Sequence, residues 1–298
     1  MGESLPIATP LADPRLKAGP SDRYFDYCLE AYAPRRPLTE RSRRSEAFLW
    51  ASLEHAGIRE RMEPLLEAIR ASVGRDLTVW GVKLDRGQLW WELYFYDPRD
   101  ELPASKVEAL RQTLAPWVAL TPVLPAHQKY MMVSFDLDGP TLDRGTVDQV
   151  DLYLTGTPEH AGRAYAAVGD PATFELRNTY RFLDPKREID VLLPLLQASV
   201  FADLNDEKRL AQALMPRFFP CKRICAAKKR DRDGIYFSGI AIDQLADFLE
   251  RFEYPAPLRA LATEHEAAFE HLSFDIGIDY RQEGEALVYP KSSFYGTL

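Results

Sequence analysis

The sequence lacks several features that would place it quickly in a class. It has no run of about 18 apolar residues, so no membrane-spanning helix is expected. Its beginning, MGESLPIATPLADP, has no apolar core, which argues against a secretory signal. Three cysteines, Cys28, Cys221 and Cys225, form no paired framework, so reduced thiols and a cytoplasmic location are expected.

The sequence also has no excess of positive charge and few histidines and cysteines. The net charge of −8 argues against a general nucleic-acid-binding protein. Five histidines and three cysteines show no ligand spacing, so we expect no structural metal site. What remains is an ordinary globular composition, with 46% hydrophobic and 28% charged residues over 298 positions.

The most informative stretch is LWWELYFYDP, from Leu89 to Pro98. Successive side chains of a strand point to opposite faces, so this segment has two different faces. One carries Trp91, Leu93 and Phe95, and the other carries Trp90, Glu92, Tyr94 and Tyr96. A strand with one face in water would explain the carboxylate, but it rarely presents so many large aromatic rings to solvent.

The rest of the chain alternates helical segments with pairs of predicted strands. Helices are expected over 22–33, 45–72 with a break near Gly57, 104–117, 205–217 and 242–269. Strand pairs are expected at 79–84 with 88–97, 129–138 with 147–156, 174–183 with 187–195, 222–229 with 234–240, and 271–280 with 286–295.

These five hairpins predict an α+β fold in which ten antiparallel strands close into a barrel. The strands again have one apolar face, such as Val133, Phe135 and Leu137, and one mixed face. Helices that cover the apolar faces would leave the mixed faces in a shared interior. Ten strands enclose a lumen wider than side chains alone fill. Glu92 would then point into this lumen.

The order of the hairpins resembles the ABBA-fold (PT-barrel) prenyltransferases, and most of all the peptide prenyltransferases of cyanobactin-type biosynthesis. The similar segments are VSFDLD…VDLYLTGTPE, RFLDPKREIDVLLPL, CKRICAAKK…GIYFSGI and VYPKSSFY. The resemblance implies one catalytic barrel domain over residues 21–298, after a flexible leader at 1–20. Where the family usually has basic residues on the strand QVDLYL, this chain has Gln149, Asp151 and Tyr153.

The resemblance implies a monomeric enzyme of natural product biosynthesis. It would move an isoprenyl group from an allylic diphosphate to a side chain of a ribosomal cyclic peptide (a RiPP). Two alternatives stay open: prenylation of a small aromatic such as an indole or phenol, and a non-catalytic barrel that binds a hydrophobic ligand. Neither nucleic acid nor a membrane is an expected partner. No DDxxD-like motif is present, which disfavours the all-helical prenyl synthases.

Prenyl transfer requires cations for the diphosphate, because guanidinium and ammonium groups stabilise the charge that develops on the leaving group. Tyrosine hydroxyls can donate to the same oxygens. The candidates are Arg177, Arg181, Lys222, Lys229, Lys291, Tyr153, Tyr236 and Tyr289. Lys291 also matches a family position. Magnesium, if used, would be carried by the diphosphate and not by a dedicated protein site.

The other candidates are an acid–base group and a pocket for the prenyl group and acceptor. Glu92 is the candidate general base, with Asp76 as the second choice because it lies near a family glutamate. The pocket candidates are Trp90, Tyr94, Tyr96, Asp136, Phe237, Ser238 and Ser273. Related enzymes tend to have bulkier residues than these two serines, so a geranyl or longer donor is expected over dimethylallyl.

Overall fold

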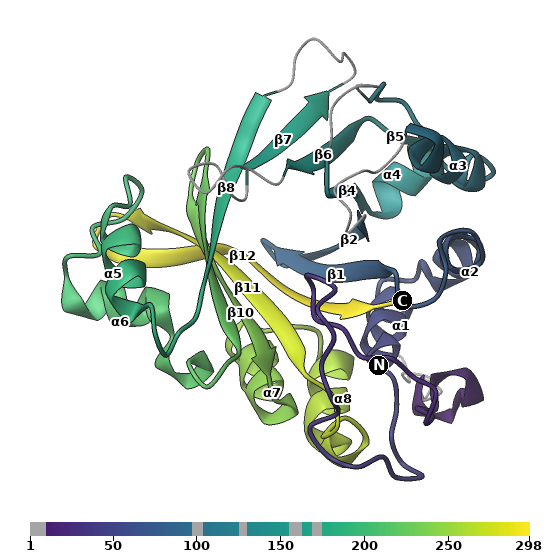
Figure 1. Ribbon diagram of the computed structural model, residues 1–298, viewed down its shortest axis with the longest axis horizontal. Coiled ribbons are helices and arrows are strands. Elements are labelled where there is room, and N and C mark those ends of the chain that lie inside the picture. Colours follow the sequence, from purple (N-terminus) through teal and green to yellow (C-terminus); the bar gives the residue numbers. More distant parts are fainter. Residues whose placement is uncertain (1–9, 97–103, 125–129, 155–162, 169–174) are drawn as a thin grey trace, which may run out of the picture.

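The computed structural model describes residues 10–96, 104–124, 130–154, 163–168 and 175–298. Its main strands are β1 Thr78–Asp85, β2 Gln88–Tyr96, β4 Met132–Leu137, β6 Gln149–Leu154, β7 Arg163–Val168, β8 Glu175–Leu183, β9 Arg223–Lys229, β10 Asp233–Ile240, β11 Phe274–Glu283 and β12 Ala286–Thr297. They close an antiparallel barrel in the order β1-β12-β11-β10-β9-β8-β7-β6-β4-β2 (Figure 1). A two-stranded sheet pairs β3 (Ala119–Leu120) with β5 (Thr146–Val147). The predicted curled antiparallel sheet is confirmed.

Helices surround the outside of this barrel (Figure 1). They are α1 Glu46–His55, α2 Arg59–Val73, α3 Ala104–Leu114, α4 Gly139–Arg144, α5 Ile189–Gln197, α6 Glu207–Leu214, α7 Ile242–Arg251 and α8 Ala256–Glu264. Short 3₁₀ turns are η1 Pro10–Ala12, η2 Pro14–Leu16, η3 Pro216–Phe218 and η4 Glu266–Ala268. None of these described helices has the length and apolar character needed to cross a membrane.

The main hydrophobic core lies between the barrel and the helices. The apolar face predicted for β2 is buried there, with Trp91, Leu93 and Phe95 all below 5% exposed. Trp91 donates its indole N–H to Ser52 Oγ of α1 at 2.8 Å, which fixes β2 against that helix. The same residue alternation directs Glu92 to the inside. The two faces of this strand are therefore as predicted.

The turn between β1 and β2 is also as predicted. Arg86 and Gly87 both have positive φ, at 49° and 79°, as a two-residue hairpin turn of type I′ requires. This turn fixes the register, in which Lys83 pairs with Trp90 and Gly81 pairs with Glu92. Lys83 and Glu92 are therefore brought to the same face of neighbouring strands.

Two predicted elements were wrong, and one strand was not predicted. Residues 187–195 are not a strand: α5 lies there, with Leu192 and Leu196 buried one helical turn apart. The hairpin partner of β8 is instead β7, in a segment for which no element was predicted. Residues 22–33 are not a helix, because this segment is irregular and closes on itself through a bridge between Phe25 and Ala31.

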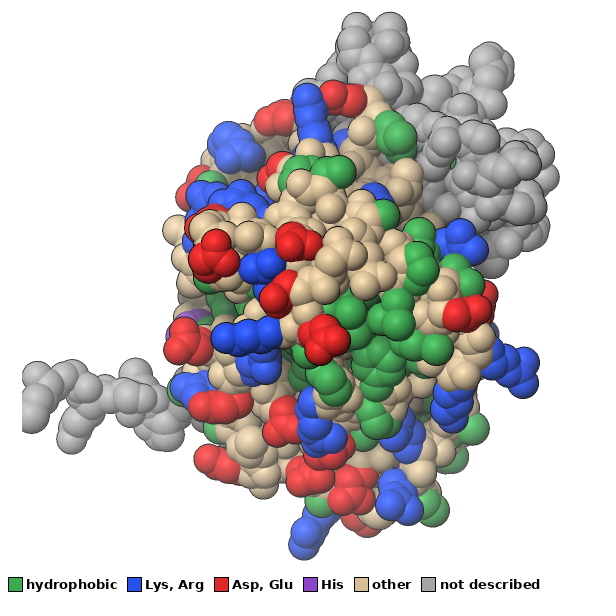
Figure 2. Space-filling view, turned by 90° about the vertical axis from the view of Figure 1, so that its left-hand side faces the viewer, with side chains coloured by type: hydrophobic (Ala, Val, Ile, Leu, Met, Phe, Trp, Pro, Cys, Tyr) green, Lys and Arg blue, Asp and Glu red, His purple; other side chains and the backbone are tan. Residues whose placement is uncertain are grey.

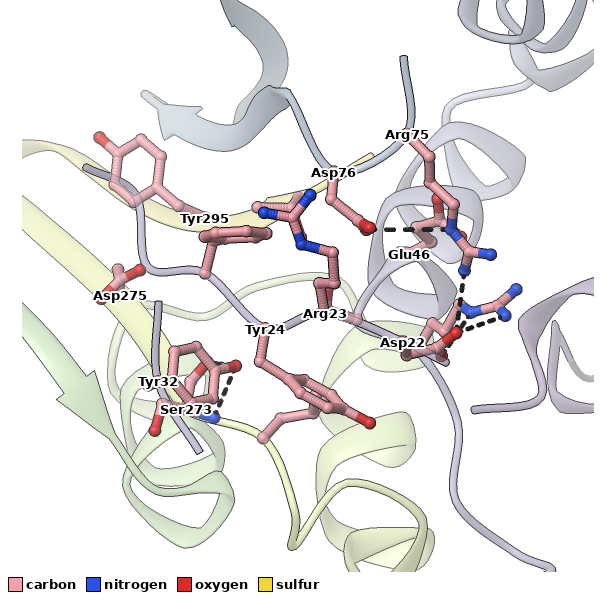
Figure 3. Close-up of a pocket in the computed structure, with 16 residues that line it drawn as sticks. Asp22, Arg23, Tyr24, Tyr32, Glu46, Arg75, Asp76, Ser273, Asp275 and Tyr295 are labelled. Carbon is pink, nitrogen blue, oxygen red and sulfur yellow. Dashed lines mark hydrogen bonds and ion pairs between the residues drawn. The ribbon is translucent and has the colours of Figure 1, made fainter. Parts of the chain in front are cut away.

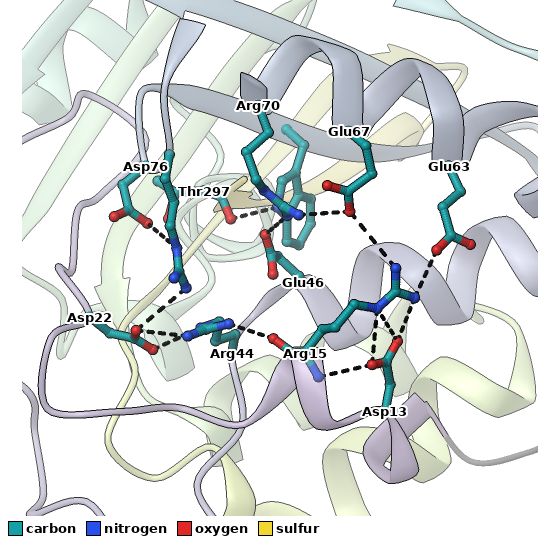
Figure 4. Close-up of polar contacts among 12 residues, drawn as sticks. Asp13, Arg15, Asp22, Arg44, Glu46, Glu63, Glu67, Arg70, Asp76 and Thr297 are labelled. Carbon is teal, nitrogen blue, oxygen red and sulfur yellow. Dashed lines mark hydrogen bonds and ion pairs between the residues drawn. The ribbon is translucent and has the colours of Figure 1, made fainter. Parts of the chain in front are cut away.

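The N-terminal part of the chain is fixed by ion pairs to α2 and to Arg44, just before α1 (Figure 4). Arg44 contacts Asp22 at 2.8 Å, and Arg15 contacts Glu63 of α2 at 2.7 Å. Leu16 is almost fully buried in the main core. Within the leader predicted at 1–20, residues 10–20 are thus packed against the helices, and residues 1–9 lie outside the described residues.

Figure 2 shows the face of the molecule that is on the left in Figure 1, where α5 and α6 lie. Hydrophobic side chains gather at the middle of this face, and charged side chains surround them. The large exposed hydrophobic residues of this region include Ile189 at the start of α5 and Val200 just after its end.

Candidate active site

The inward faces of the strands divide the barrel interior into a charged end and an aromatic end. Along β12 the inward side chains are Lys291, Ser293 and Tyr295, at steps of two residues. Lys291 lines a charged cavity and Tyr295 lines an aromatic one. With a rise of about 3.3 Å per residue, the two levels are roughly 13 Å apart along the strand.

The charged cavity has a volume of about 610 Å³. Its lining is Lys83, Asp85, Trp90, Asp136, Gln149, Asp151, Arg177, Asn178, Lys229, Arg230, Asp231, Arg232, Asp279 and Lys291. At its wall, Asp279 of β11 accepts from Lys229 at 2.5 Å and lies 3.2 Å from Lys291. Two lysines from β9 and β12 are therefore held together by one carboxylate.

These three charges strongly affect one another's pKa. Burial would raise the pKa of Asp279, but Lys229 and Lys291 outweigh it and lower the value to about 2. Burial lowers the pKa of Lys229 to about 8, and the neighbouring charge of Lys291 acts in the same direction against Asp279. Near neutral pH the cluster thus holds two ammonium groups and one carboxylate.

A second charged group surrounds Glu92, which is only 5% exposed. Lys83 of β1 contacts Glu92 directly and lies 2.7 Å from Asp136 of β4. Tyr94 and Ser134 also donate hydrogen bonds to the Glu92 carboxylate. Burial raises the pKa of Glu92, but Lys83 and these two hydroxyls lower it by more. The net pKa is therefore below its ordinary value, and Glu92 is ionised.

A smaller cavity of about 250 Å³ adjoins the first and shares Trp90, Asp136, Gln149 and Asp151 with it. Glu92 lies in its wall. Burial and the charge of Glu92 raise the pKa of Asp151 to about 6, although Arg177 contacts its carboxylate at 3.3 Å. This cavity therefore presents several carboxylates to whatever enters it.

The aromatic end is a cavity of about 80 Å³ that we call the tyrosine pocket. Its lining is Tyr27, Cys28, Val79, Tyr94, Tyr96, Met131, Met132, Tyr153, Leu154, Tyr180, Phe182, Cys225, Tyr236 and Tyr295. Neighbouring tyrosine rings lie 5.6 to 6.5 Å apart, as between Tyr27 and Tyr295 or Tyr27 and Tyr236. The pocket wall is thus a nearly continuous set of π faces.

The tyrosine hydroxyls mark the boundary between the two ends. Tyr236 accepts from Lys229 at 2.9 Å, and Tyr180 accepts from the amide of Asn178 at 2.9 Å. Tyr94 donates to Glu92 from the same strand. Since Lys229 and Asn178 line the charged cavity, the rings face the apolar space while their hydroxyls contact the charged end.

Two glycines make room for these rings. A Cβ at Gly277 of β11 would lie 2.2 Å from the Tyr236 ring, and one at Gly81 of β1 would lie 2.8 Å from the Tyr295 ring. Both glycines have ordinary extended backbone, so steric room and not φ explains them. The rings of Tyr236 and Tyr295 therefore pack directly against the backbone of Gly277 and Gly81, where no side chain projects from the inner wall.

The structure brings together most of the residues predicted for the site. Glu92, Asp136, Arg177, Lys229, Lys291 and Trp90 line the two charged cavities. Tyr94, Tyr96, Tyr153 and Tyr236 line the tyrosine pocket. Tyr153 and Tyr236, which were assigned to the diphosphate, therefore place their rings in the aromatic wall.

Four predicted residues lie elsewhere on the barrel. Arg181 is exposed on the outer face of β8, because its neighbours Tyr180 and Phe182 take the inward positions. Lys222 pairs with Asp26 at 3.2 Å, in the N-terminal segment. The two aromatic residues Tyr289 and Phe237 pack in the outer core against Phe252 and Phe218.

Asp76, Ser238 and Ser273 also lie apart from Glu92. Figure 3 shows Asp76 beside Arg75 in a small cavity under the N-terminal segment, where its φ is 62°. Ser273 lines this same cavity and bonds to Tyr32 (Figure 3). Ser238 is buried on β10 beyond Tyr236, and neither serine lines the tyrosine pocket.

Two residues of the charged end were missed by the sequence analysis. Lys83 and Asp279 make central contacts there, and both occupy inward positions of their strands. The alternation of VWGVKL carried the signal for Lys83, since Trp80 and Val82 mark the outer face. The partner acid on the next strand could then be found from the turn that fixes the register.

Asp275 offers a test of the electrostatics at the aromatic end. It is buried beside Asp26, and its oxygens accept from the backbone N–H groups of Tyr27 at 2.7 Å and Gly239 at 3.0 Å. Burial and the charge of Asp26 raise its pKa from 3.8 to about 7. The folded protein thus keeps a proton between about pH 4 and 7 that the unfolded chain loses, so this group lowers stability as the pH rises through that window.

We expect Asp275→Asn to remove this dependence. The variant loses one acceptor at every pH, but its free energy of unfolding should improve relative to the wild type as the pH rises from 4.5 to 7.5. Urea denaturation of both proteins at pH 4.5 and 7.5 gives the free energy of unfolding of the variant relative to the wild type, and this relative value is compared between the two pH values. Parallel pH profiles for the two proteins would show that Asp275 titrates near its ordinary value.

No protein-family model matches the chain, and no curated protein matches it. Among solved structures it is similar to 5-dimethylallyltryptophan synthase from Streptomyces coelicolor, with 11% identity, a TM-score of 0.45, and 84% of this chain and 96% of that chain covered. The structure of the same enzyme in complex with DMASPP and Trp matches with 12% identity and a TM-score of 0.45, over 84% of this chain and 94% of that chain.

Proposed function

We propose that the protein is a prenyltransferase of the ABBA-fold type, with a ten-stranded catalytic barrel as its active domain. One observation carries this proposal: inside one closed barrel, Lys229 and Lys291 lie next to a pocket lined by tyrosine rings. Lys229 bonds directly to Tyr236, so the cation site and the π surface share a boundary. A hydrophobic-ligand carrier has no need of this cation site.

In the proposed reaction the carbon–oxygen bond of an allylic diphosphate breaks, and the diphosphate leaves with the bonding electrons. Lys229, Lys291 and Arg177 would bind its oxygens and stabilise the charge that develops there. The allylic chain would lie in the tyrosine pocket, where each π face contributes roughly 0.5–2 kcal/mol toward a cation. The acceptor atom then bonds to the allylic carbon and loses a proton.

Glu92 is the proposed proton acceptor. It is ionised, it faces the cavity of about 250 Å³, and the Lys83 and Ser134 contacts fix its orientation. A carboxylate with a lowered pKa is a weak base, but an acceptor made positive by alkylation is a strong acid. Asp136 and Asp151 add negative charge around the same cavity, which favours a cationic or hydrogen-bond-donating acceptor such as an arginine, histidine or indole side chain.

We propose a side chain of a ribosomal peptide as the acceptor. The charged cavity extends to Arg230 and Arg232, in the connection between β9 and β10, where Arg230 is largely exposed. A substrate much larger than an indole can therefore present one side chain to Glu92 from outside. Any Mg²⁺ would enter with the diphosphate, since the described residues include no group of three or more His, Cys, Asp and Glu placed to hold a metal.

The donor proposed here is shorter than the sequence led us to expect. The preference for geranyl rested on Ser238 and Ser273, and neither serine lines the tyrosine pocket. A cavity of about 150 Å³ holds one benzene molecule. The tyrosine pocket, at about 80 Å³, is smaller than this, which favours the shortest donor, so we propose dimethylallyl diphosphate.

The function is tested by incubating the protein with a small panel of cyclic peptides and with C5, C10 and C15 diphosphates. Mass spectrometry should find one peptide carrying an added C5 group, on a cationic or indole side chain. Tryptophan alone serves as the small-aromatic comparison. Prenylation of tryptophan and of no peptide would favour the small-aromatic alternative, and no thermal stabilisation by any diphosphate would favour the non-catalytic barrel.

A further inference from the structure

The segment 22–35, the N-terminal segment that was expected to be partly helical, packs against the aromatic end of the barrel. Tyr27 and Cys28 are the residues through which it enters the wall of the tyrosine pocket. In Figure 1 the tip of this purple segment reaches the strands beside β12. The Tyr27 ring lies 5.6 Å from that of Tyr295 and stacks on that of Tyr236 at 6.5 Å. A side chain from outside the barrel strands therefore forms part of the pocket wall, against the rings of Tyr236 and Tyr295.

The backbone of this segment is held independently of the Tyr27 ring. Asp275 accepts from the Tyr27 N–H at 2.7 Å, and the Tyr96 hydroxyl donates to the Tyr27 carbonyl. On the other side Asp26 and Glu30 pair with Lys222 and Arg223, at 3.2 Å and 2.7 Å.

Further anchors lie at the far end of the segment. The Tyr32 hydroxyl contacts both Ser273 N and Ser273 O, and the Arg35 guanidinium donates to the Gly239 carbonyl at 3.1 Å. These contacts use backbone atoms and other side chains. Shortening Tyr27 should therefore enlarge the pocket without releasing the segment.

We propose that Tyr27 is the residue that limits the length of the isoprenoid accepted by this barrel. The inference rests on the proposed function, since it concerns the donor of that reaction. A chain whose diphosphate is bound by Lys229 and Lys291 enters the tyrosine pocket from the charged end and meets the Tyr27 ring at the floor. The phenol removed by a change to alanine has more heavy atoms than the five carbons of an isoprene unit.

The test compares the binding of dimethylallyl and geranyl S-thiolodiphosphates, which are unreactive donor analogues, by isothermal calorimetry. Tyr27→Ala should lower the ratio of the geranyl Kd to the dimethylallyl Kd by at least tenfold. Tyr24→Ala is the matched control, because Tyr24 belongs to the same segment but does not line the tyrosine pocket. Its ratio should stay within twofold of the wild type. Tyr27→Leu gives a smaller change in the same direction if the alanine variant is poorly folded.

The outcomes separate this inference from the proposed function. If the wild type and the variants bind dimethylallyl but Tyr27→Ala and Tyr27→Leu leave the ratio unchanged, Tyr27 does not limit chain length. An equal shift in Tyr24→Ala would attribute the change to loosening of the segment and would also overturn the assignment. A wild type that binds neither analogue would overturn the proposed function itself, and the inference with it.

Discussion

Glu92→Gln should lower kcat by about 10²–10⁴-fold while the donor still binds. The substitution keeps the size of the side chain and one acceptor oxygen for Tyr94, and its amide NH2 can donate to the Ser134 hydroxyl, but it removes the negative charge. Lys83 would keep Asp136 as its counter-ion at 2.7 Å, so no buried cation is left unpaired. The loss should therefore appear in the chemical step and not in folding.

The measurement is single-turnover prenylation with saturating donor, followed by calorimetry with an unreactive thiolodiphosphate. Asp136→Asn is the matched control, because it removes the other carboxylate beside Lys83 and leaves Glu92 in place. We expect a smaller loss in that variant. If Glu92→Gln turns over at the wild-type rate, Glu92 only orients Lys83 and the acceptor proton leaves by another route.

The face of β2 that holds Glu92 could be predicted because its two sets of side chains are sharply different. Trp91 and Leu93 belong on a buried outer face, so Glu92 had to point inward. The same reasoning applies to Lys83: Trp80 and Val82 lie on the outer face of β1, so Lys83 lies on the inner face. Where alternation is strict and a short turn sets the register, a lumen residue can be found from sequence.

Other parts of the fold depend on contacts that no local pattern records. The segment IDVLLPLLQ is a continuous apolar run, which suits a buried strand or a helix equally well, and the packing of Leu192 and Leu196 decides for α5. The segment at 22–33 has apolar residues at helical spacing. Its course is instead decided by Asp275, Lys222 and Arg223, which lie about 200 residues or more away in sequence. Tyr27 could not be placed in the pocket without those contacts.

Lys229→Ala and Lys291→Ala should each cost about 1.5–3 kcal/mol of transition-state stabilisation, or about 10- to 150-fold in kcat/KM. The side chains of both lysines are largely shielded from solvent, at 8% and 18% exposed, and both contact Asp279, which holds them together at the wall of the charged cavity. Removing either one leaves the other paired with Asp279, so the barrel should still fold. The loss should fall mainly on donor binding and on departure of the diphosphate.

Two cations outside the cavity, one on β9 and one on the adjacent strand β8, supply controls. Lys228 is adjacent to Lys229 but points outward and pairs with Asp233 at 2.6 Å. Arg181 is exposed on the outer face of β8. Lys228→Ala and Arg181→Ala should both keep kcat/KM within about twofold of the wild type, because neither side chain reaches the cavity. An equal loss in these variants would mean that overall positive charge, and not the site, attracts the donor.

The pH dependence distinguishes the two buried lysines. Burial and the charge of Lys291 lower the pKa of Lys229 to about 8, whereas the net effect of Asp279 and its surroundings raises the pKa of Lys291 against burial. A diphosphate binds the protonated form, so donor affinity should weaken as the pH rises through 8. This break should disappear in Lys229→Ala and move to higher pH in Lys291→Ala, where the charge that lowers the Lys229 pKa is gone, when Kd is measured from pH 6.5 to 9.5. A break that persists in both variants would assign the titration to another group and remove Lys229 from the diphosphate site.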